Sequence, residues 1–212
     1  MKKKIEVIIG CECSGEVRRA FNTNPLITAY SCDLQPADDG ETSLHLIGDL
    51  KAIINSRQWD LGIFHPPCTY LANSGVHHLY NEDNSFNWER YSDLQKGIEF
   101  FNYCLSLPIP SVCVENPIMH KWAKDLSICR EPTQLIQPYM FGHTESKATC
   151  LWLKHLPKLQ PTNVLPYYDQ SCWKEPPSEL RAKIRSKTYP GIAKAMAEQW
   201  GYYLISKQLG IN

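Results

Sequence analysis

The sequence predicts an α/β fold in which helices cover both faces of a mostly parallel sheet. Short apolar runs of strand length alternate along the chain with longer stretches of helical spacing, which is the pattern of such a sheet. Each apolar run also ends in a polar loop. The length of 212 residues, 43% of them apolar, suits one core and is too short for two full domains. We therefore expect a single domain over residues 1–212.

The expected elements follow in chain order. Short apolar runs, several of them rich in β-branched residues, predict strands at 5–10, 27–32, 61–64, 111–114 and 149–153. Helices are predicted at 15–21, 88–107 and 189–206. The second of these is the clearest, because Ile98, Phe101 and Leu105 recur at near-helical spacing and Pro108 follows. Prolines, tyrosines and polar residues predict a short loop-rich insertion at about 154–187.

Composition excludes several classes of protein. No apolar run approaches the roughly 20 residues that a membrane helix needs, and no secretory signal precedes the first strand, so we expect a cytoplasmic protein that does not enter membranes. The nine cysteines are scattered and form no CxxC pair, which favours reduced thiols over a disulfide framework. The formal net charge is zero, whereas a domain that wraps duplex DNA by itself usually carries a basic excess.

Any contact with nucleic acid must then come from a local patch. The best candidate is the segment 174–187, which could equally be a solvated helix face. Its cations are Lys174, Arg181, Lys183, Arg185 and Lys187.

Candidate functional residues collect where the predicted strands end, which is where ligands bind in open α/β sheets. The first strand leads into a loop whose glycine, Gly15, allows close approach of a ligand and starts a helix. Asp33 ends the second strand, about 20 residues further on, where an acidic residue can accept the hydroxyl protons of a ribose; capping a turn is its other reading. Asp49 follows Gly48 after another short apolar segment and could reach an adenine amine.

The tetrapeptide His65-Pro66-Pro67-Cys68 is more informative. Two prolines after a strand fix the backbone and aim the next side chain, so the Cys68 thiol is a candidate nucleophile. Glu115 ends a neighbouring strand and would face the same cleft if the two strands are adjacent. Its carboxyl can hydrogen-bond to a ring nitrogen, provided that the site raises its pKa. A buried cysteine and a structural ion pair are the alternative readings of the two residues.

Metal binding is the competing use of the cysteines and histidines. Cys11 and Cys13 are only two residues apart, His77 and His78 are adjacent, and no second pair stands at a zinc-type spacing. We therefore expect no metal site.

Taken in chain order, these segments resemble the motifs of the DNA cytosine-5 methyltransferase family, and the resemblance covers most of the chain. Residues 11–15 resemble its first cofactor loop, and residues 66–68 match its Pro-Pro-Cys loop, with Thr69 where Gln is commoner. Residues 115–117 resemble its Glu-Asn motif, with Pro117 in place of the commoner Val. Residues 141–147 resemble a segment that normally supplies Gln and two Arg, and residues 189–193 resemble its closing motif.

The resemblance implies a Rossmann-like, S-adenosylmethionine-dependent methyltransferase fold and an enzyme that methylates C5 of cytosine through a cysteine adduct at C6. The residues that it implies for cofactor binding are Cys11, Ser14, Gly15, Asp33, Asp49, Pro66 and Gly191. Those that it implies for catalysis are Cys68, Glu115 and Lys147, and those for substrate binding are Pro67, Asn116, Pro117 and Glu145.

The long target-recognition region of the family is reduced here to about 35 residues after Leu153, as in a short phage- or prophage-like member. The substrate could then be duplex DNA, single-stranded DNA or a cytosine nucleotide, and a partner could supply sequence recognition. Two other classes remain open: a catalytically silent relative that binds cofactor or nucleic acid, and an enzyme that modifies base amino groups on the same scaffold.

Overall fold

The computed structural model describes residues 4–169 and 186–211. Within these ranges, seven strands form one sheet in the order β3-β2-β1-β4-β5-β7-β6. Strands β1 to β5 pair in parallel, and β7 runs antiparallel to both of its neighbours. The predicted mostly parallel α/β class is therefore confirmed. The strands are β1 (Ile5–Gly10), β2 (Ile27–Asp33), β3 (His45–Ile47), β4 (Leu61–Phe64), β5 (Ser111–Pro117), β6 (Gln134–Ile136) and β7 (Thr149–Lys154).

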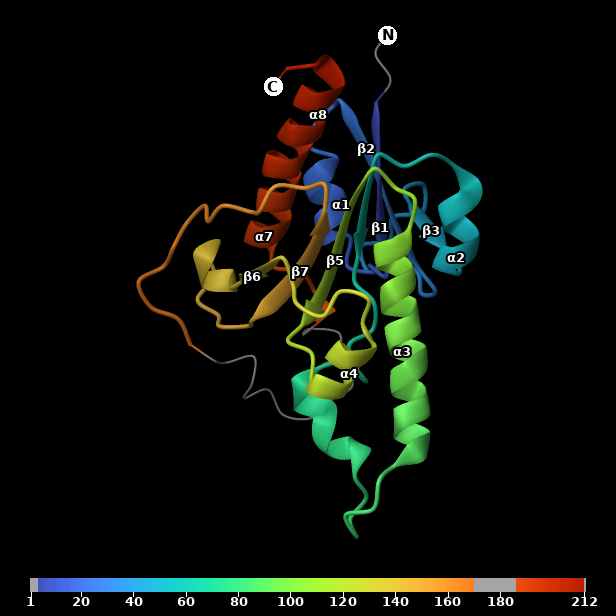
Figure 1. Ribbon diagram of the computed structural model, residues 1–212. Coiled ribbons are helices and arrows are strands. Elements are labelled where there is room, and N and C mark those ends of the chain that lie inside the picture. The colour runs from blue at the N-terminus through green and yellow to red at the C-terminus, as the bar shows by residue number, and fades with distance from the viewer. Residues whose placement is uncertain (1–3, 170–185, 212) are drawn as a thin grey trace.

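Helices lie on both faces of the sheet (Figure 1). One face is covered by α1 (Glu16–Phe21), α7 (Pro190–Ala195), the π-helical turn η4 (Met196–Trp200) and α8 (Gly201–Leu209). The other face is covered by α2 (Leu50–Ile53), η1 (Ile54–Ser56), α3 (Trp88–Ser106) and α4 (Lys121–Leu126). The remaining elements are the 3₁₀ helices η2 (Asn73–Leu79) and η3 (Pro138–Met140).

The alternation of side chains along β1 explains the two-layered core. Val7 and Ile9 pack with the helices of the first face, whereas Ile8, between them, packs with those of the second. Because successive side chains of a strand point to opposite faces, a strand covered on both sides must be apolar throughout. This is why the predicted strands appear as continuous apolar runs.

The order of the strands reverses at β1. From β1 the chain proceeds to β2 and β3 on one side and then returns to β4 and β5 on the other side of β1. Ligands of open α/β sheets bind beyond the carboxyl ends of the strands at such a reversal. The loops that follow β1 and β4 therefore border the expected binding crevice, at the end of the sheet where α4 lies (Figure 1).

Strand β5 is longer than predicted, because β7 pairs with it as far as Pro117, which lies opposite Thr149. Glu115 and Asn116 thus lie within a strand rather than in the loop after it. The predicted continuous helix over 189–206 is also wrong in detail, since a π-helical turn separates α7 from α8. Short elements that the sequence did not indicate are β6, α2, α4 and the 3₁₀ helices.

Residues 155–169 of the loop-rich insertion contain neither helix nor extended strand. The basic residues Lys174, Arg181, Lys183 and Arg185 lie outside the described residues. Lys187 is described, and its ammonium lies 3.8 Å from a carboxylate oxygen of Asp38. Among the described helices, none is long and apolar enough to cross a membrane.

Candidate active site

Side-chain hydrogen bonds from Glu12 and Ser14 hold the loop after β1 against the start of α1. Cys11 and Gly15 both have positive φ angles, 61° and 68°, and between them the buried Glu12 accepts hydrogen bonds from the backbone N–H groups of Val17 (2.8 Å) and Arg18 (3.3 Å). Ser14 donates to the same carboxylate at 3.3 Å. Glu12 thus caps α1, and its burial raises its pKa even though these N–H groups favour the charged form.

Asp33 and Asp49 lie at the carboxyl ends of β2 and β3. Asp33 accepts from the backbone N–H of Gln35 at 3.0 Å, and Asp49 caps α2 by accepting from Lys51 at 2.9 Å. Both carboxylates are near Cys32, whose pKa is raised to about 12 by burial and then by these two charges. The structure therefore brings Asp33 and Asp49, two of the predicted cofactor-binding residues, to the same part of the sheet edge. Each carboxylate accepts one hydrogen bond from a backbone N–H of the turn or helix that follows it.

The Cys68 loop is held against β5. Asn116, which is buried, donates from Nδ2 to the carbonyl oxygen of Pro66 at 2.8 Å. The backbone of the segment after Cys68 pairs with that of the segment after Pro117. Asn73 N–H donates to Ile118 O at 2.8 Å, and residues 72 and 119 form an isolated antiparallel β-bridge. Asn116 consequently orients the proline pair, whereas the sequence suggested a contact with substrate. Cys68 itself is half-buried and Pro67 is exposed.

Glu115 makes an ion pair that the sequence analysis did not foresee. His65 Nδ1 lies 2.9 Å from Glu115 Oε2, and the two side chains are only 10% and 19% exposed. Burial raises the pKa of Glu115, but the hydrogen bond and charge of His65 outweigh burial, and the net pKa is lowered. The condition under which Glu115 would donate a hydrogen bond to a ring nitrogen, a raised pKa, is therefore not met. The sequence feature that could have identified His65 is its position directly before the proline pair that precedes Cys68.

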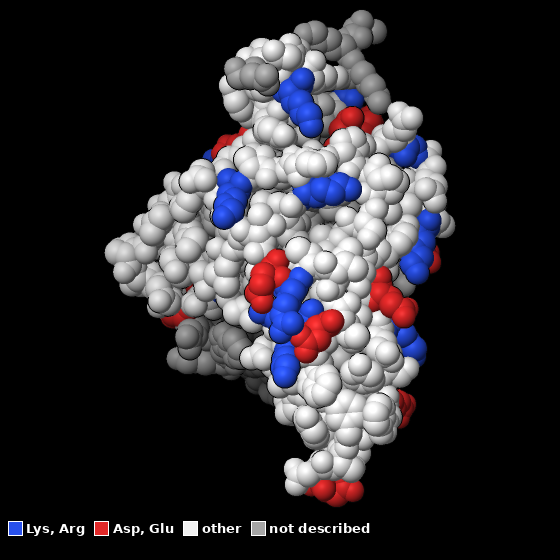
Figure 2. Space-filling model, in the orientation of Figure 1, with Lys and Arg blue, Asp and Glu red and all other residues white. Residues whose placement is uncertain are grey.

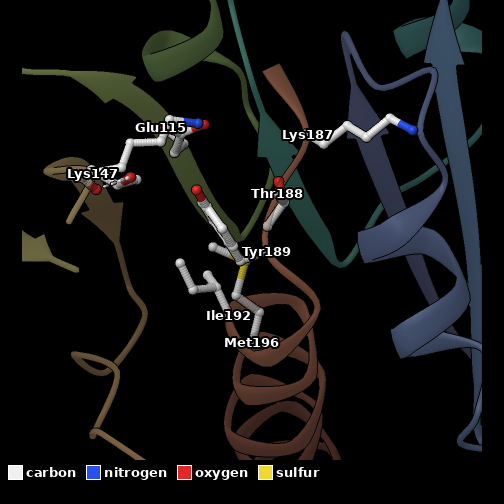
Figure 3. A pocket seen from close by; sticks show the side chains of 8 residues that line it. Glu115, Lys147, Lys187, Thr188, Tyr189, Ile192 and Met196 are labelled. Atoms are coloured by element: carbon white, nitrogen blue, oxygen red, sulfur yellow. Dashed lines mark hydrogen bonds between the residues drawn. The ribbon is translucent and has the colours of Figure 1, made fainter. Parts of the chain in front are cut away.

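A pocket joins Glu115 to the segment before α7 (Figure 3). Lys147 lines it, with its ammonium 5.7 Å from the centre of the Tyr189 ring, and the hydroxyl end of Tyr189 points toward Glu115 and Lys147 (Figure 3). The described residues that line the pocket are Glu115, Lys147, Thr149, Lys187, Thr188, Tyr189, Ile192 and Met196. Cys68 is not among them. The structure thus groups Glu115 with Lys147 and connects Cys68 to them through the strand pair β4–β5.

The closing segment packs against residues 141–145. Gly191 donates its backbone N–H to His143 Nε2 at 2.9 Å, and α7 contacts α1. Glu145 is half-buried, and its backbone forms an isolated parallel β-bridge with that of Asp169. Gly191 and Glu145 therefore have structural partners in addition to the binding roles that the sequence suggested.

A cluster of aromatic residues lies next to the Cys68 loop and escaped the sequence analysis. Phe86 is at its centre, with ring centroids 4.9 Å from Trp88 and 5.7 Å from Trp122. Trp88 is 72% exposed. On the same helix, Arg90 donates to the carbonyl oxygen of Thr69 at 2.7 Å and lies 4.2 Å from the centre of the Tyr70 ring. The aromatic cluster, which comprises Tyr80, Phe86, Trp88, Tyr91 and Trp122, is thus connected to the residue after Cys68.

Metal ligands and surface charge are two further features of the described residues. No group of three or more His, Cys, Asp or Glu side chains in residues 4–169 and 186–211 is placed to hold a metal ion. On the face shown in Figure 2, Lys and Arg are spread out and mixed with Asp and Glu.

Comparison with known proteins shows the fold. No family model and no curated protein matches the sequence. Among solved structures, the chain is similar to a presumed DNA modification methyltransferase encoded within a prophage, from E. coli, with a TM-score of 0.50 and 13% identity. The match covers 82% of this chain and 56% of that protein, so this chain spans little more than half the length of its structural neighbour.

Proposed function

We propose that this protein is an S-adenosylmethionine-dependent methyltransferase that acts on C5 of cytosine in DNA. The observation that carries the proposal is the hydrogen bond between Asn116 and Pro66, because it fixes the Cys68 loop against the strand that presents Glu115. A thiol on a loop held against β5 and a buried carboxyl on that strand are the two groups that covalent activation of a pyrimidine requires. The DNA-modifying description of the structural neighbour supports the same class of substrate.

The carboxylates beyond β2 and β3 fit the cofactor. Asp33 and Asp49 gather two carboxylates around Cys32, and each uses one oxygen in capping its own turn. Ribose hydroxyls and an adenine amine are donors, and carboxylate oxygens at the end of a second strand are suitable acceptors for them. When bound, S-adenosylmethionine supplies the methyl group that C5 receives.

The side chains of this protein would do the rest of the chemistry. Cys68 Sγ forms a bond to C6, and the electron pair of the C5–C6 double bond moves toward C5. Glu115 binds the ring edge that includes N3, and Lys147, in the same pocket, lies beside it. After methylation, loss of the C5 proton to solvent and departure of Cys68 restore the double bond. A base in duplex DNA must first leave the stack, because a thiol cannot reach C6 within it.

The exposed rings beside the Cys68 loop support a nucleic-acid substrate. Bases stack on aromatic side chains whatever their identity, with about 1–3 kcal/mol per base. Trp88 is the most exposed member of the aromatic cluster, and Arg90 links the same helix to Thr69. We therefore infer that bases flanking the target cytosine stack on the aromatic cluster.

Trapping of a covalent adduct tests this function. Single-stranded and duplex DNA with 5-fluorocytosine would be incubated with the protein, with and without S-adenosylmethionine, and analysed by intact mass. Because fluorine cannot leave as a proton, methyl transfer should leave protein and DNA joined. Cys68→Ser should abolish the adduct, since a serine hydroxyl is almost wholly un-ionised at neutral pH.

Cys150→Ser is the matched control, because Cys150 is buried and its pKa is raised to about 11 by burial first and by Glu115 next. This variant should still form the adduct. An adduct that persists in Cys68→Ser, or that maps to another cysteine, would contradict the mechanism. Methylation of the base amino group without any adduct would instead assign the chain to amino methylation.

A further inference from the structure

The strand register places His65 opposite Glu115. Ile63 of β4 pairs with Cys113 of β5, and both pack into the core on the α7 side of the sheet. Two residues further along each strand, His65 and Glu115 therefore point to the same face. The backbone N–H of His65 donates to Gly10 O at 3.0 Å, which fixes the histidine between the loop after β1 and the end of β5.

The imidazole lies among charged groups of both signs. Its Nδ1 is 2.9 Å from Glu115 Oε2, and the charge of Glu12, from the loop after β1, also favours the protonated ring. Lys147, from the segment before β7, opposes protonation. Lys187 lines the pocket of Glu115 as well, but its ammonium lies 3.8 Å from Asp38. Burial disfavours the charged ring, but the hydrogen bond and charge of Glu115, with a smaller contribution from Glu12, outweigh burial and raise the pKa of His65.

We propose that His65 is a positioning residue, which holds Glu115 as a fixed carboxylate by occupying one of its oxygens. A carboxylate with one oxygen bound this way presents the other to the ring edge of the base. On the N3 edge of cytosine, the amino group is the donor that a carboxylate can accept from, whereas N3 itself is an acceptor. The choice of base rests on the proposed function, but the pairing of His65 with Glu115 does not.

Burial supports this role. Both side chains lie mostly inside the protein, and a carboxylate buried without a partner would bind a proton instead. Burial alone raises the pKa of Glu115, and the neighbouring imidazolium reverses that shift. Without His65, we expect Glu115 to be protonated over a wider pH range and free to change its side-chain rotamer.

The test combines NMR with kinetics. In the wild-type protein with ¹³C-labelled glutamate, the Glu115 carboxyl, assigned by loss of its signal in Glu115→Gln, should remain ionised below its ordinary pKa. In His65→Gln its midpoint should move to higher pH. His155→Gln is the control, because that residue is exposed and its ring Nδ1 lies 2.9 Å from Pro110 O, far from Glu115 in the sequence. The wild-type titration does not use His65→Gln, so a failure of that variant to fold leaves the proposal testable.

Kinetics separate this inference from the proposed function. In an active protein, His65→Gln should lower kcat on the order of 100-fold, as misplacement of a catalytic group does, with the KM for cofactor unchanged. The acid limb of its pH profile should move to higher pH. An unshifted Glu115 midpoint in His65→Gln, or a wild-type midpoint at or above the ordinary value, would overturn the inference. A shifted midpoint in a protein without activity on DNA would overturn the proposed function and leave the pairing intact.

Discussion

Gly191 is the position where a side chain has the least room. A Cβ there would lie 2.0 Å from the carbonyl oxygen of Phe141 and 2.8 Å from His143 Nε2. Gly191→Ala should therefore lower the free energy of unfolding by about 1–3 kcal/mol, because the backbone of Phe141 must shift. Urea denaturation would measure it.

Gly97→Ala in α3 is the matched control. The nearest atom to its Cβ would be Leu71 Cδ2 at 3.5 Å, which is ordinary contact. Alanine in a helix interior is favoured over glycine by roughly 0.5–1 kcal/mol, so this variant should be as stable as the wild type or more so. If Gly191→Ala matched Gly97→Ala in stability, the close packing of the closing segment against residues 141–143 would be wrong.

The His65–Glu115 pair should make stability depend on pH in a defined window. The folded pKa of Glu115 is below its ordinary value of 4.5, so its contribution is present above that value and lost as pH falls through the folded pKa. The folded pKa of His65 is above its ordinary value of 6.5, because Glu115 outweighs burial. Its contribution is complete below 6.5 and lost as pH rises through the folded pKa.

The stability difference between wild type and His65→Gln should consequently be largest between pH 4.5 and 6.5, where both partners are charged. Urea titrations at about pH 5.5 and about pH 8.5 would compare the two proteins. Glu12 contributes to the difference as well, because the charge of His65 lowers the pKa of Glu12 in the wild type and is absent in His65→Gln. A difference that is constant across this range would show that the pair is not ionic.

At the residue scale, the sequence identified the chemical groups but not their pairing. Cys68 stands out because a rigid proline pair precedes it after an apolar run, and Glu115 stands out because it is the polar residue at the end of another apolar run. His65 did not, since its partner is 50 residues away and their contact depends on the register between β4 and β5. The sign of the pKa shift of Glu115 could not be predicted for the same reason: burial is local to a strand, whereas the neutralising charge comes from another strand.

The start of α3 carries the next prediction. If bases stack on the aromatic cluster, Trp88→Ala should weaken binding of single-stranded DNA by about 1–3 kcal/mol without changing stability much. Tyr202→Ala is a control of equal exposure, since both side chains are 72% exposed and Tyr202 lies on α8. Fluorescence anisotropy would measure both variants. Equal affinities of the two variants would exclude the aromatic cluster as the stacking surface.

The boundaries of some strands and helices depend only on their own residues, whereas others depend on distant segments of the chain. Strand β1 and strand β4 have the predicted bounds, because each is a short apolar run buried on both faces. Strand β5 continues through Pro117 because its outer neighbour β7 pairs with it there, and no local feature of the sequence reports that neighbour. In the last helix, the π-helical turn coincides with Trp200, whose ring N–H bonds to Pro157 O at 2.9 Å. That contact also involves a distant segment.

At the scale of the whole molecule, alternation of strands and helices was enough to predict the fold class, because every parallel strand needs a covered face and a crossover. The order of strands was not predictable in this way. It makes β1 and β4 neighbours, so that the loop after β1 and the Cys68 loop follow adjacent strands at the same edge of the sheet.

If the proposed function is right, the balance of charge over the whole chain limits the affinity of this protein for DNA. Its 22 basic and 22 acidic residues give a formal net charge of zero, and the visible face in Figure 2 mixes the two signs. Non-specific affinity arises from cations that displace counterions, so binding of random duplex should be no tighter than about 10⁻⁶ M at physiological salt and should fall steeply as salt rises.

Single strands should bind better than duplex of the same sequence, because their unpaired bases can stack on the aromatic cluster. The preference should also persist at higher salt, since stacking releases no counterions, whereas phosphate contacts weaken. Titrations of labelled single strands and duplexes across a salt series would measure both effects. Nanomolar binding to one duplex sequence at physiological salt would contradict this expectation, because it would require sequence readout that the charge balance and the described surface do not predict.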